Sequence, residues 1–466
     1  MKKTLIISLS ICLVLVAAYG AAVYWIGEQA LKQHDQLIAQ INHSNYLEAS
    51  PVNYERGLFR STARTTLTLT RFEKEGSIRF NIISSIYHGP FVFINNPHFK
   101  GGFRPVIAVI RTKLAPGDCS DAWKKMLENI PELESSQVLT VLFIDGGAET
   151  YIDIPSFQKE FSGVKGEKFK LQWDGFTGKS KFDLRLDEIT GSFNSPSLEI
   201  SGKDQLLRLK NMQFDFDSHS GPRGISVGSA AFSIGGIEGR EGDDSSFNLS
   251  SVGLKAESGV SGETIGCSFW LRFEKFNAGG LEVGPFAMEF EARKLDVEVL
   301  SRFQKLAPEF REKARENSKD AEQEMEKLAV GIILDLLAKS PEFEIKQLKL
   351  KTDKGDLSGR AKLGFADPVG NPSPNVIVLL RNVDAIAELT VSEPLLLFVA
   401  ENVVRNASQD PKSAKMGADA IIMGLMAAKY ITLDGGSFKS NASYKHGVLA
   451  VNGRKLDLSG LKHKDD

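Results

Sequence analysis

The strongest hydrophobic pattern in the chain lies at its beginning. After Lys2 and Lys3, residues 4–26 contain no charged side chain. As a helix this segment would be about 34 Å long, enough to cross a hydrocarbon core of about 30 Å. The paired lysines favour a cytoplasmic N-terminus and a chain that continues across the membrane. We therefore predict a transmembrane anchor over residues 1–27, with a cleaved signal peptide as the alternative, because small residues cluster at residues 17–22.

The segment after the anchor has a helical period. Leu31, Leu37, Ile38 and Ile41 recur at roughly helical spacing among polar residues, which predicts a helical stalk over residues 28–50. Its narrow apolar stripe would pack onto the body of the protein or onto a second copy, so a homo-oligomer is one expectation. Pro51 should end the helical segment.

From residue 51 to about residue 295 the pattern changes to that of strands and tight turns. Residues 66–70 and 207–216 alternate apolar with polar side chains, as one-sided antiparallel strands do. Two hairpins are predicted. Residues 138–144 and 148–154 flank Asp145-Gly146-Gly147, and residues 168–173 and 179–186 flank a turn that contains Gly175.

Two helical blocks interrupt the strands in residues 296–466. The first has an apolar face from Leu300 to Ile332, which Pro308 should divide and Pro341 should close. The second covers residues 393–430, with Asp410-Pro411 as a new first turn. Its uncharged run, residues 420–428, is too short to span a bilayer, so we expect a core helix, with a surface that touches lipid or an amphiphile as the alternative. Strands should resume at residues 432–442 and 444–451.

These patterns predict an α+β fold. We expect a large, twisted, mostly antiparallel β-sheet with packed amphipathic helices, preceded by one N-terminal transmembrane helix. Residues 51–295 would form its β-rich region, and residues 296–466 the helical blocks and last strands of the same periplasmic body. Two sublobes divided near residue 295 and a single extended body both fit the pattern.

Charge and cysteine usage exclude some functions. The chain has 57 Lys and Arg against 59 Asp and Glu, a formal charge of -2, so no nucleic-acid partner is expected. The seven histidines are scattered and no Cys/His pattern has zinc spacing, so we predict no metal site and no cofactor. Cys12 lies in the anchor, which leaves Cys119 and Cys267 either as a disulfide or as two free thiols.

Five short motifs together resemble a known family. They are Tyr54-Glu55-Arg56-Gly57-Leu58-Phe59-Arg60-Ser61, His88-Gly89-Pro90, Trp173-Asp174-Gly175, Tyr444-Lys445-His446-Gly447 and Asn452-Gly453. In this order, after an anchor helix, they resemble the YdgA-like bacterial proteins of unknown function, with Arg60 in place of the usual Ser and Trp173 in place of the usual Tyr. The resemblance implies an inner-membrane-anchored periplasmic protein of Gram-negative bacteria, of unassigned activity and without assigned catalytic residues.

We expect structural roles for these motif residues. Tyr54, Arg56 and Gly57 could bind a ligand, but a turn before a strand needs a glycine and Arg56 readily pairs with a carboxylate. His88 could be a catalytic base, but Gly89-Pro90 is strong turn punctuation, so we predict a corner.

Two apparent enzyme motifs fail on their context. Ser226 lies in a Gly-x-Ser-x-Gly string, but a nucleophile elbow requires a following helix and residues 229–234 continue like a strand. Residues 175–180 imitate the end of a phosphate loop, but Trp173 stands where a glycine is required. We predict no catalytic residue, and an envelope hydrolase with an unrecognised site is the third hypothesis for the function.

Phenylalanine is unusually frequent. The chain has 29 Phe against 8 Tyr and 4 Trp, and such rings favour dry surroundings. A closed core would bury them, and an incompletely covered sheet would leave a groove suited to acyl chains. The first hypothesis is therefore a non-enzymatic membrane-anchored protein that binds or scaffolds an amphiphile or an envelope protein partner. The second is a structural role through self-assembly.

Overall fold

The computed structural model describes residues 47–69, 78–88, 106–115, 119–162, 167–242, 245–316, 319–365, 382–407 and 411–456, with single positions between residues 28 and 42. Two compact units are present: unit 1 comprises residues 1–203 and 210–217, and unit 2 comprises residues 204–209 and 218–466. The predicted anchor and most of the predicted stalk lie outside the described residues. None of the described helices is long and apolar enough to cross a membrane.

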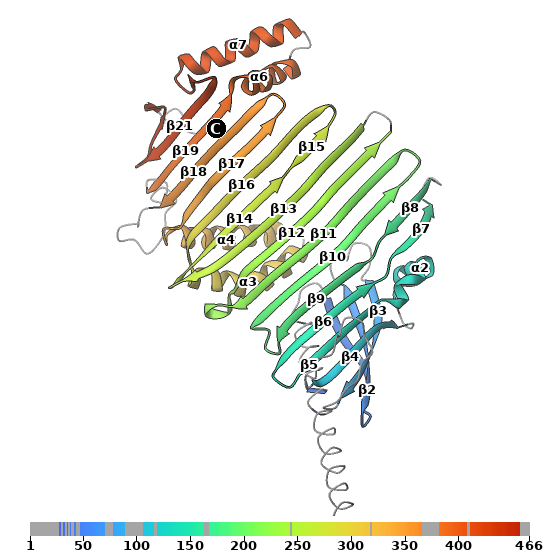
Figure 1. Cartoon of the computed structure of the whole chain (residues 1–466). Helices are drawn as coiled ribbons and strands as arrows, with labels where there is room; N and C mark the ends of the chain where they lie inside the picture. Colours follow the sequence, from blue (N-terminus) through green and yellow to red (C-terminus); the bar gives the residue numbers. More distant parts are fainter. Residues whose placement is uncertain are drawn as a thin grey trace, which may run out of the picture. The chain divides into compact units, whose positions relative to one another are not determined.

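From β1 onward, the described residues of unit 1 form an antiparallel meander that also contains the short helix α2 (Asp121–Asn129) and a 3-10 turn, η2 (Pro131–Ser135) (Figure 1). Its strands up to residue 203 are β1 (Leu47–Glu55), β2 (Arg60–Leu69), β3 (Ile78–His88), β4 (Val106–Ala115), β5 (Gln137–Phe143), β6 (Gly147–Ile154), β7 (Phe157–Ser162), β8 (Lys168–Trp173), β9 (Phe176–Asp183) and β10 (Glu188–Ser201).

The predicted helical stalk extends too far, because β1 already begins at Leu47. Residues 47–50 pair with β2 as a strand, and the register shifts between Pro51 and Asn53. A proline is tolerated there because its missing N–H coincides with an irregular part of the ladder.

The core of unit 1 lies around β4, which packs apolar side chains on both of its faces. One cluster contains Ala63, Ile86, Ala108, Ile110, Leu142 and Ala148. The other contains Val106, Val109, Leu139, Val141 and Phe143. The β5–β6 hairpin is confirmed, with Gly146 in the left-handed region at φ 87°.

The predicted hairpin at residues 168–186 is wrong. β8 and β9 both pair with β10, in one unbroken register, so they are successive parts of one line that is interrupted at Asp174-Gly175. β6 and β7 flank this line in the same way, interrupted at Pro155-Ser156. We call the two interruptions the crease. A Gly-containing dipeptide between strands signals a turn, but here it bends a strand without reversing it.

Unit 2 is a second antiparallel meander, in which β12 to β19 follow one another side by side, with β15 in line after β14 (Figure 1). Its strands are β12 (Ser226–Glu241), β13 (Ser245–Ser261), β14 (Thr264–Phe273), β15 (Lys275–Ala278), β16 (Leu281–Asp296), β17 (Glu342–Thr352), β18 (Gly355–Phe365), β19 (Val383–Ser392), β20 (Thr432–Asp434), β21 (Ser437–Lys445), β22 (Val448–Val451) and β23 (Arg454–Leu456). A 3-10 turn, η3 (Pro222–Gly224), precedes them, and β11 (Gln205–Ser220) contributes residues to both units.

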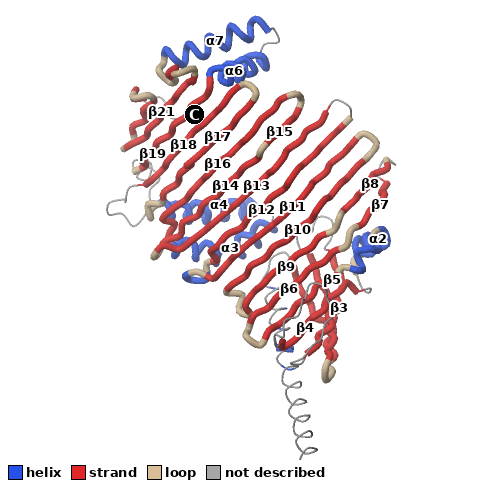
Figure 2. Tube along the Cα trace, in the orientation of Figure 1, coloured by secondary structure: helices blue, strands red, loops and turns tan. Residues whose placement is uncertain are grey.

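Two helix pairs interrupt the meander at opposite ends of its strands (Figure 2). α3 (Val297–Glu316) and α4 (Lys319–Leu337) connect β16 to β17, and α6 (Glu393–Ala407) and α7 (Pro411–Ala427) connect β19 to β20. α3 continues through Pro308, so the predicted division there is wrong: the proline removes one hydrogen bond but does not end the helix. β16 ends at Asp296 and pairs with β17, so residue 295 marks a change from strand to helix within unit 2.

α7 is a core helix only on one side. Ala418 and Ile422 pack in a cluster with Ala400 and Phe438. Of residues 420–428, however, only Ile422 is buried, so the expected core helix is not borne out for most of that run.

The last predicted turns are confirmed. His446 and Gly447 have φ values of 51° and 81°, and Asn452 and Gly453 have φ values of 46° and 78°. Two consecutive left-handed residues are the requirement of the tightest hairpins. These turns join β21 to β22 and β22 to β23. The large antiparallel sheet with few helices agrees with the predicted fold class.

We expect Gly175→Ala to destabilise unit 1 by about 1 to 3 kcal/mol. Gly175 has a φ of 92°, and a Cβ atom there would lie 2.8 Å from the carbonyl oxygen of Ile154. Gly146→Ala is the matched control, since Gly146 has a similar φ of 87° and open space around it. Urea unfolding of both variants measures the difference; equal losses would show that the close approach at the crease is unimportant.

Candidate functional site

The first and second motifs meet in unit 1. Oγ of Ser61, at the start of β2, lies 2.9 Å from Nε2 of His88, at the end of β3. Both side chains are buried, with 0% of Ser61 and 3% of His88 exposed. The backbone N–H of His88 also donates to the carbonyl oxygen of Phe59 at 3.1 Å. Gly89 and Pro90, the rest of the second motif, lie outside the described residues.

This serine and histidine resemble a nucleophile and its base, but the surroundings oppose that role. Nδ1 of His88 is buried without a hydrogen-bond partner among the described residues. Burial lowers the pKa of His88, and the positive charge of Arg56 lowers it further, so the imidazole is neutral. A serine nucleophile has to touch its substrate, and Ser61 is fully enclosed. The pair therefore joins the ends of two strands.

Gly57 and its neighbours have structural roles of a different kind from the one predicted. Gly57 is not in the left-handed region; instead, a Cβ atom there would overlap the carbonyl oxygen of Arg60. Tyr54 packs on the core cluster that contains Ile86. Phe59 is 53% exposed, and it is therefore an unusual surface ring.

The third motif builds the crease. Nε1–H of Trp173 donates to Oγ of Ser195 at 2.8 Å, and that hydroxyl donates to the carbonyl oxygen of Gly175 at 2.9 Å. The ring of Phe157 meets Trp173 edge-on, with the ring centres 5.6 Å apart. These contacts give hydrogen-bond partners to polar groups that the interrupted ladder leaves unpaired. The third motif therefore has a structural role at the crease.

Unit 2 holds the more promising feature. β18 alternates strictly: Ser358, Arg360 and Lys362 are exposed on one face, and Leu357, Ala361 and Leu363 occupy the other. The neighbouring strands continue this division. We call the side that carries Ala361 the apolar face. α3 and α4 cover it at one end, where Ile265, Ala292 and Leu295 are buried beneath Leu300 and Leu336.

Next to that covered end, the apolar face is hollowed into a groove of about 310 Å³. Ala361, Ala387 and Ala442 pair in one row across β18, β19 and β21 and form its floor. The side chains that rise around the floor are larger, and Phe290 and Phe343 stack with ring centres 6.4 Å apart. The other apolar side chains of the lining on this face are Ile345, Leu363, Ala385, Tyr444 and Leu449. The groove is also bordered by Glu344, Lys362, Ile386 and Ser443, which pair in the next row and alternate to the opposite face.

Tyr444 of the fourth motif is therefore a groove residue, and Gly447, Asn452 and Gly453 form the turns beside it. Asn452 fixes this corner: its Oδ1 accepts from the backbone of Asn441 at 2.9 Å, and its Nδ2 donates to the carbonyl of Lys429 at 3.0 Å. The structure thus divides the predicted motif residues between the two units, and of those it describes, only Tyr444 lines the groove.

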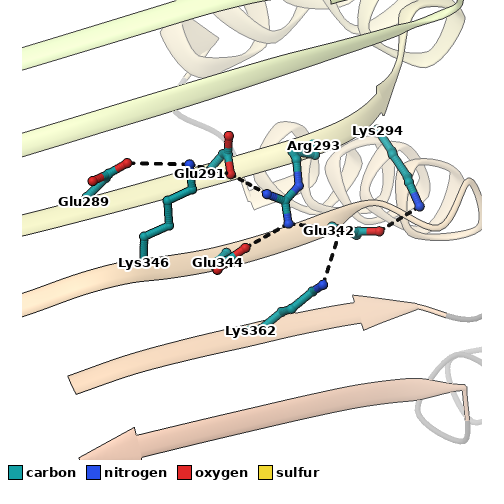
Figure 3. Close-up of polar contacts among 8 residues, drawn as sticks. All are labelled: Glu289, Glu291, Arg293, Lys294, Glu342, Glu344, Lys346 and Lys362. Atoms are coloured by element: carbon teal, nitrogen blue, oxygen red, sulfur yellow. Dashed lines mark hydrogen bonds and ion pairs between the residues drawn. The ribbon is translucent and has the colours of Figure 1, made fainter.

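The opposite face of β16, β17 and β18 carries a charge network (Figure 3). Arg293 donates to Glu342 at 3.1 Å and to Glu344 at 2.8 Å, and Lys294 lies 2.7 Å from Glu342. Four carboxylates and four cations take part; the remaining members are Glu289, Glu291, Lys346 and Lys362. The four negative and four positive charges balance. This face is therefore hydrophilic, and the network has no net charge that would attract a charged ligand.

Unit 1 also carries an apolar row. Phe176, Phe193 and Phe216 stack, with successive ring centres 5.7 and 6.0 Å apart. The ring of Phe193 fills the space above Gly178, and that of Phe216 the space above Gly191. Phe214 joins them and is 38% exposed. The abundant phenylalanines therefore line sheet faces as well as cores.

Three further sequence candidates, a metal site, the Ser226 elbow and a disulfide, do not form in the described part of the chain. No three His, Cys, Asp or Glu side chains there are grouped as metal ligands. Ser226 begins β12, which continues as a strand to Glu241, so the elbow reading fails as expected. Cys119 and Cys267 are free thiols, and burial raises the pKa of Cys267.

Fold and site together define a mostly antiparallel β protein with an apolar groove. The chain matches a model of a bacterial protein family of unknown function, DUF945, over residues 1–459, and it belongs to that family. No curated protein and no solved structure is significantly similar to it.

His88 should make stability depend on pH. Its pKa is lowered in the folded state, so the unfolded chain binds more protons below about pH 6.5. Stability is then lost as the pH falls below this value, by at most about 1.4 kcal/mol per pH unit. His88→Gln should remove this part of the slope in urea unfolding between about pH 7.5 and 5.5. An unchanged slope would contradict the assignment.

Glu342 should act in a more acidic range. Hydrogen bonds from Lys294 and Arg293 lower its pKa to about 2, from 4.5. Its contribution to stability is complete above pH 4.5 and decreases as the pH falls toward 2. Glu342→Gln should therefore flatten the loss of stability between about pH 5 and 3, measured by chemical unfolding. A loss between these pH values that is equally steep in the variant would contradict this role of Glu342.

Proposed function

We propose that this protein is an envelope protein that holds an apolar chain of an amphiphile in the groove of unit 2, without catalysing a reaction. The observation that carries the proposal is the groove itself, a row of alanines bounded by stacked phenylalanines on a face that the described helices cover only in part. A volume of about 310 Å³ is at the lower end of the range of small-molecule sites, about 300–1,000 Å³.

The lining chemistry favours an acyl chain. The side chains on the apolar face that line the groove carry no charge, and the charges of β16 to β18 are paired on the opposite face. Each methylene group transferred from water into such a site contributes about 0.8 kcal/mol. Binding would thus depend on the length of the chain, with the headgroup left in water.

The N-terminal segment supports a location at the inner membrane. The uncharged residues 4–26 behind Lys2 and Lys3 favour an inner-membrane anchor with a cytoplasmic N-terminus and a periplasmic body. An anchor of this kind would keep the groove near membrane lipid. Membership of a bacterial family is consistent with this location.

Filling the groove should strongly reduce contact with lipid. The full chain is expressed in cells with p-benzoylphenylalanine in place of Tyr444, and phospholipid adducts are measured by mass spectrometry after irradiation. Ala387→Phe places a ring on the groove floor and should reduce the adducts about tenfold or more, because a bound chain would lose several methylene contacts. Ser358→Phe, on the exposed opposite face of β18, is the matched control and should leave them unchanged. Adducts that are absent, or equally reduced by both variants, would refute the proposal.

A further inference from the structure

The groove of unit 2 is long and narrow. Its lining comes from six neighbouring strands, β16, β17, β18, β19, β21 and β22. Two rows of paired residues on the apolar face supply most of it. One row is Phe343, Leu363, Ala385 and Tyr444, and the other is Ile345, Ala361, Ala387 and Ala442. Because the lining takes the same two rows from each central strand, the long axis of the groove runs across the strands.

This shape fits one extended hydrocarbon chain. Adjacent rows on one face of a sheet are two residues, or about 7 Å, apart. An α-helix with its side chains is wider, about 10–12 Å in diameter. A peptide strand would bring backbone N–H and C=O groups onto apolar side chains that offer them no hydrogen-bond partner. An acyl chain has neither the width nor the polar groups that would exclude it.

The open part of the apolar face coincides with the groove floor. On β19, Ala387 is exposed, whereas Val383 and Val391, toward the two ends of the strand on the same face, are buried. The strand is therefore covered at both ends and open in the middle, where Ala387 lies between Ala361 and Ala442.

Two phenylalanine rings close one end of the groove. Among the described residues, only Phe290 and Phe343 both line the groove and pack against the buried cluster beneath α3 and α4. Beyond Phe343, the same row continues to Ala292, which is buried in that cluster. The stacked rings therefore separate the open groove from the covered core.

The distance from the rings to the other end sets a length. Leu449 of β22 is the last residue of the lining in that direction. From Ile345 to Ala442 the row crosses three strand spacings, which amount to about 14 Å. An extended chain advances about 1.2 Å per bond, so this stretch holds about 12 carbon atoms.

We propose that Phe290 and Phe343 are the end wall of the groove and set the length of the acyl chain that it accepts. This inference rests on the proposed function and makes it more specific. The chain lies across the strands with its methyl end against the two rings, and its headgroup lies toward β22. Carbon atoms in excess of the groove length remain outside and do not strengthen binding.

The test uses the full chain reconstituted in phosphatidylcholine vesicles, with p-benzoylphenylalanine in place of Tyr444. An equal mixture of saturated fatty acids from octanoate to stearate is added, and mass spectrometry after irradiation gives the lengths of the attached chains. Phe343→Ala opens the groove toward Ala292, one strand further. Palmitate and stearate adducts should then rise about tenfold or more relative to laurate adducts, since each methylene group removed from water favours binding about fourfold. Phe343→Trp should shift the adducts toward shorter chains.

Phe286→Ala is the matched control. Phe286 stacks on Phe273 with ring centres 5.1 Å apart and lies on the same face of β16 as Phe290, outside the lining of the groove. Its removal should leave the chain lengths of the wild type, and unfolding midpoints show that the variants are folded. Chain lengths that stay the same in Phe343→Ala and in Phe343→Trp would overturn the end wall and leave the groove standing. A wild type without fatty-acid adducts would instead overturn the proposed function, and the end wall with it.

Discussion

The structure of unit 2 depends on one constraint, the need to shield the apolar side of a long antiparallel sheet from water. Alternation along each strand sends charged side chains to one side and apolar side chains to the other. The charged side can face water without a cover, since carboxylates and cations pair across β16, β17 and β18. The apolar side is shielded by α3 and α4 at only one end. The groove is what that partial cover leaves open.

Much of this architecture follows from local sequence. The strand alternation, the β5–β6 hairpin, the turns at Gly447 and Gly453 and the first turn of α7 at Pro411 all have chemistry that acts within a few residues. Two local signals misled. Gly175 has the backbone freedom of a turn residue but serves a bend, and Pro308 lies inside a helix that tolerates it. Neither α2 nor β1 was predicted, although Trp123, Met126 and Leu127 of α2 recur at helical spacing and were a usable local signal.

The candidate sites could not be predicted, because they arise from pairing between distant segments. Ser61 and His88 are 27 residues apart and meet only when β2 and β3 align. Ala361, Ala387 and Ala442 lie on three strands, and an isolated alanine has no chemical signature. The excess of phenylalanine was a usable signal: it indicated apolar surface, and it left open whether that surface was a closed core or a groove.

The crease has a consequence for how this sheet tolerates change. Pairing continues in the same register on both sides of Asp174-Gly175 and Pro155-Ser156, so the paired residues keep the same offset beyond the interruption. Adding or removing one residue there would invert the facing of every side chain beyond it, whereas a change of two would keep the order. A change of one residue at the crease therefore requires a β-bulge to absorb it.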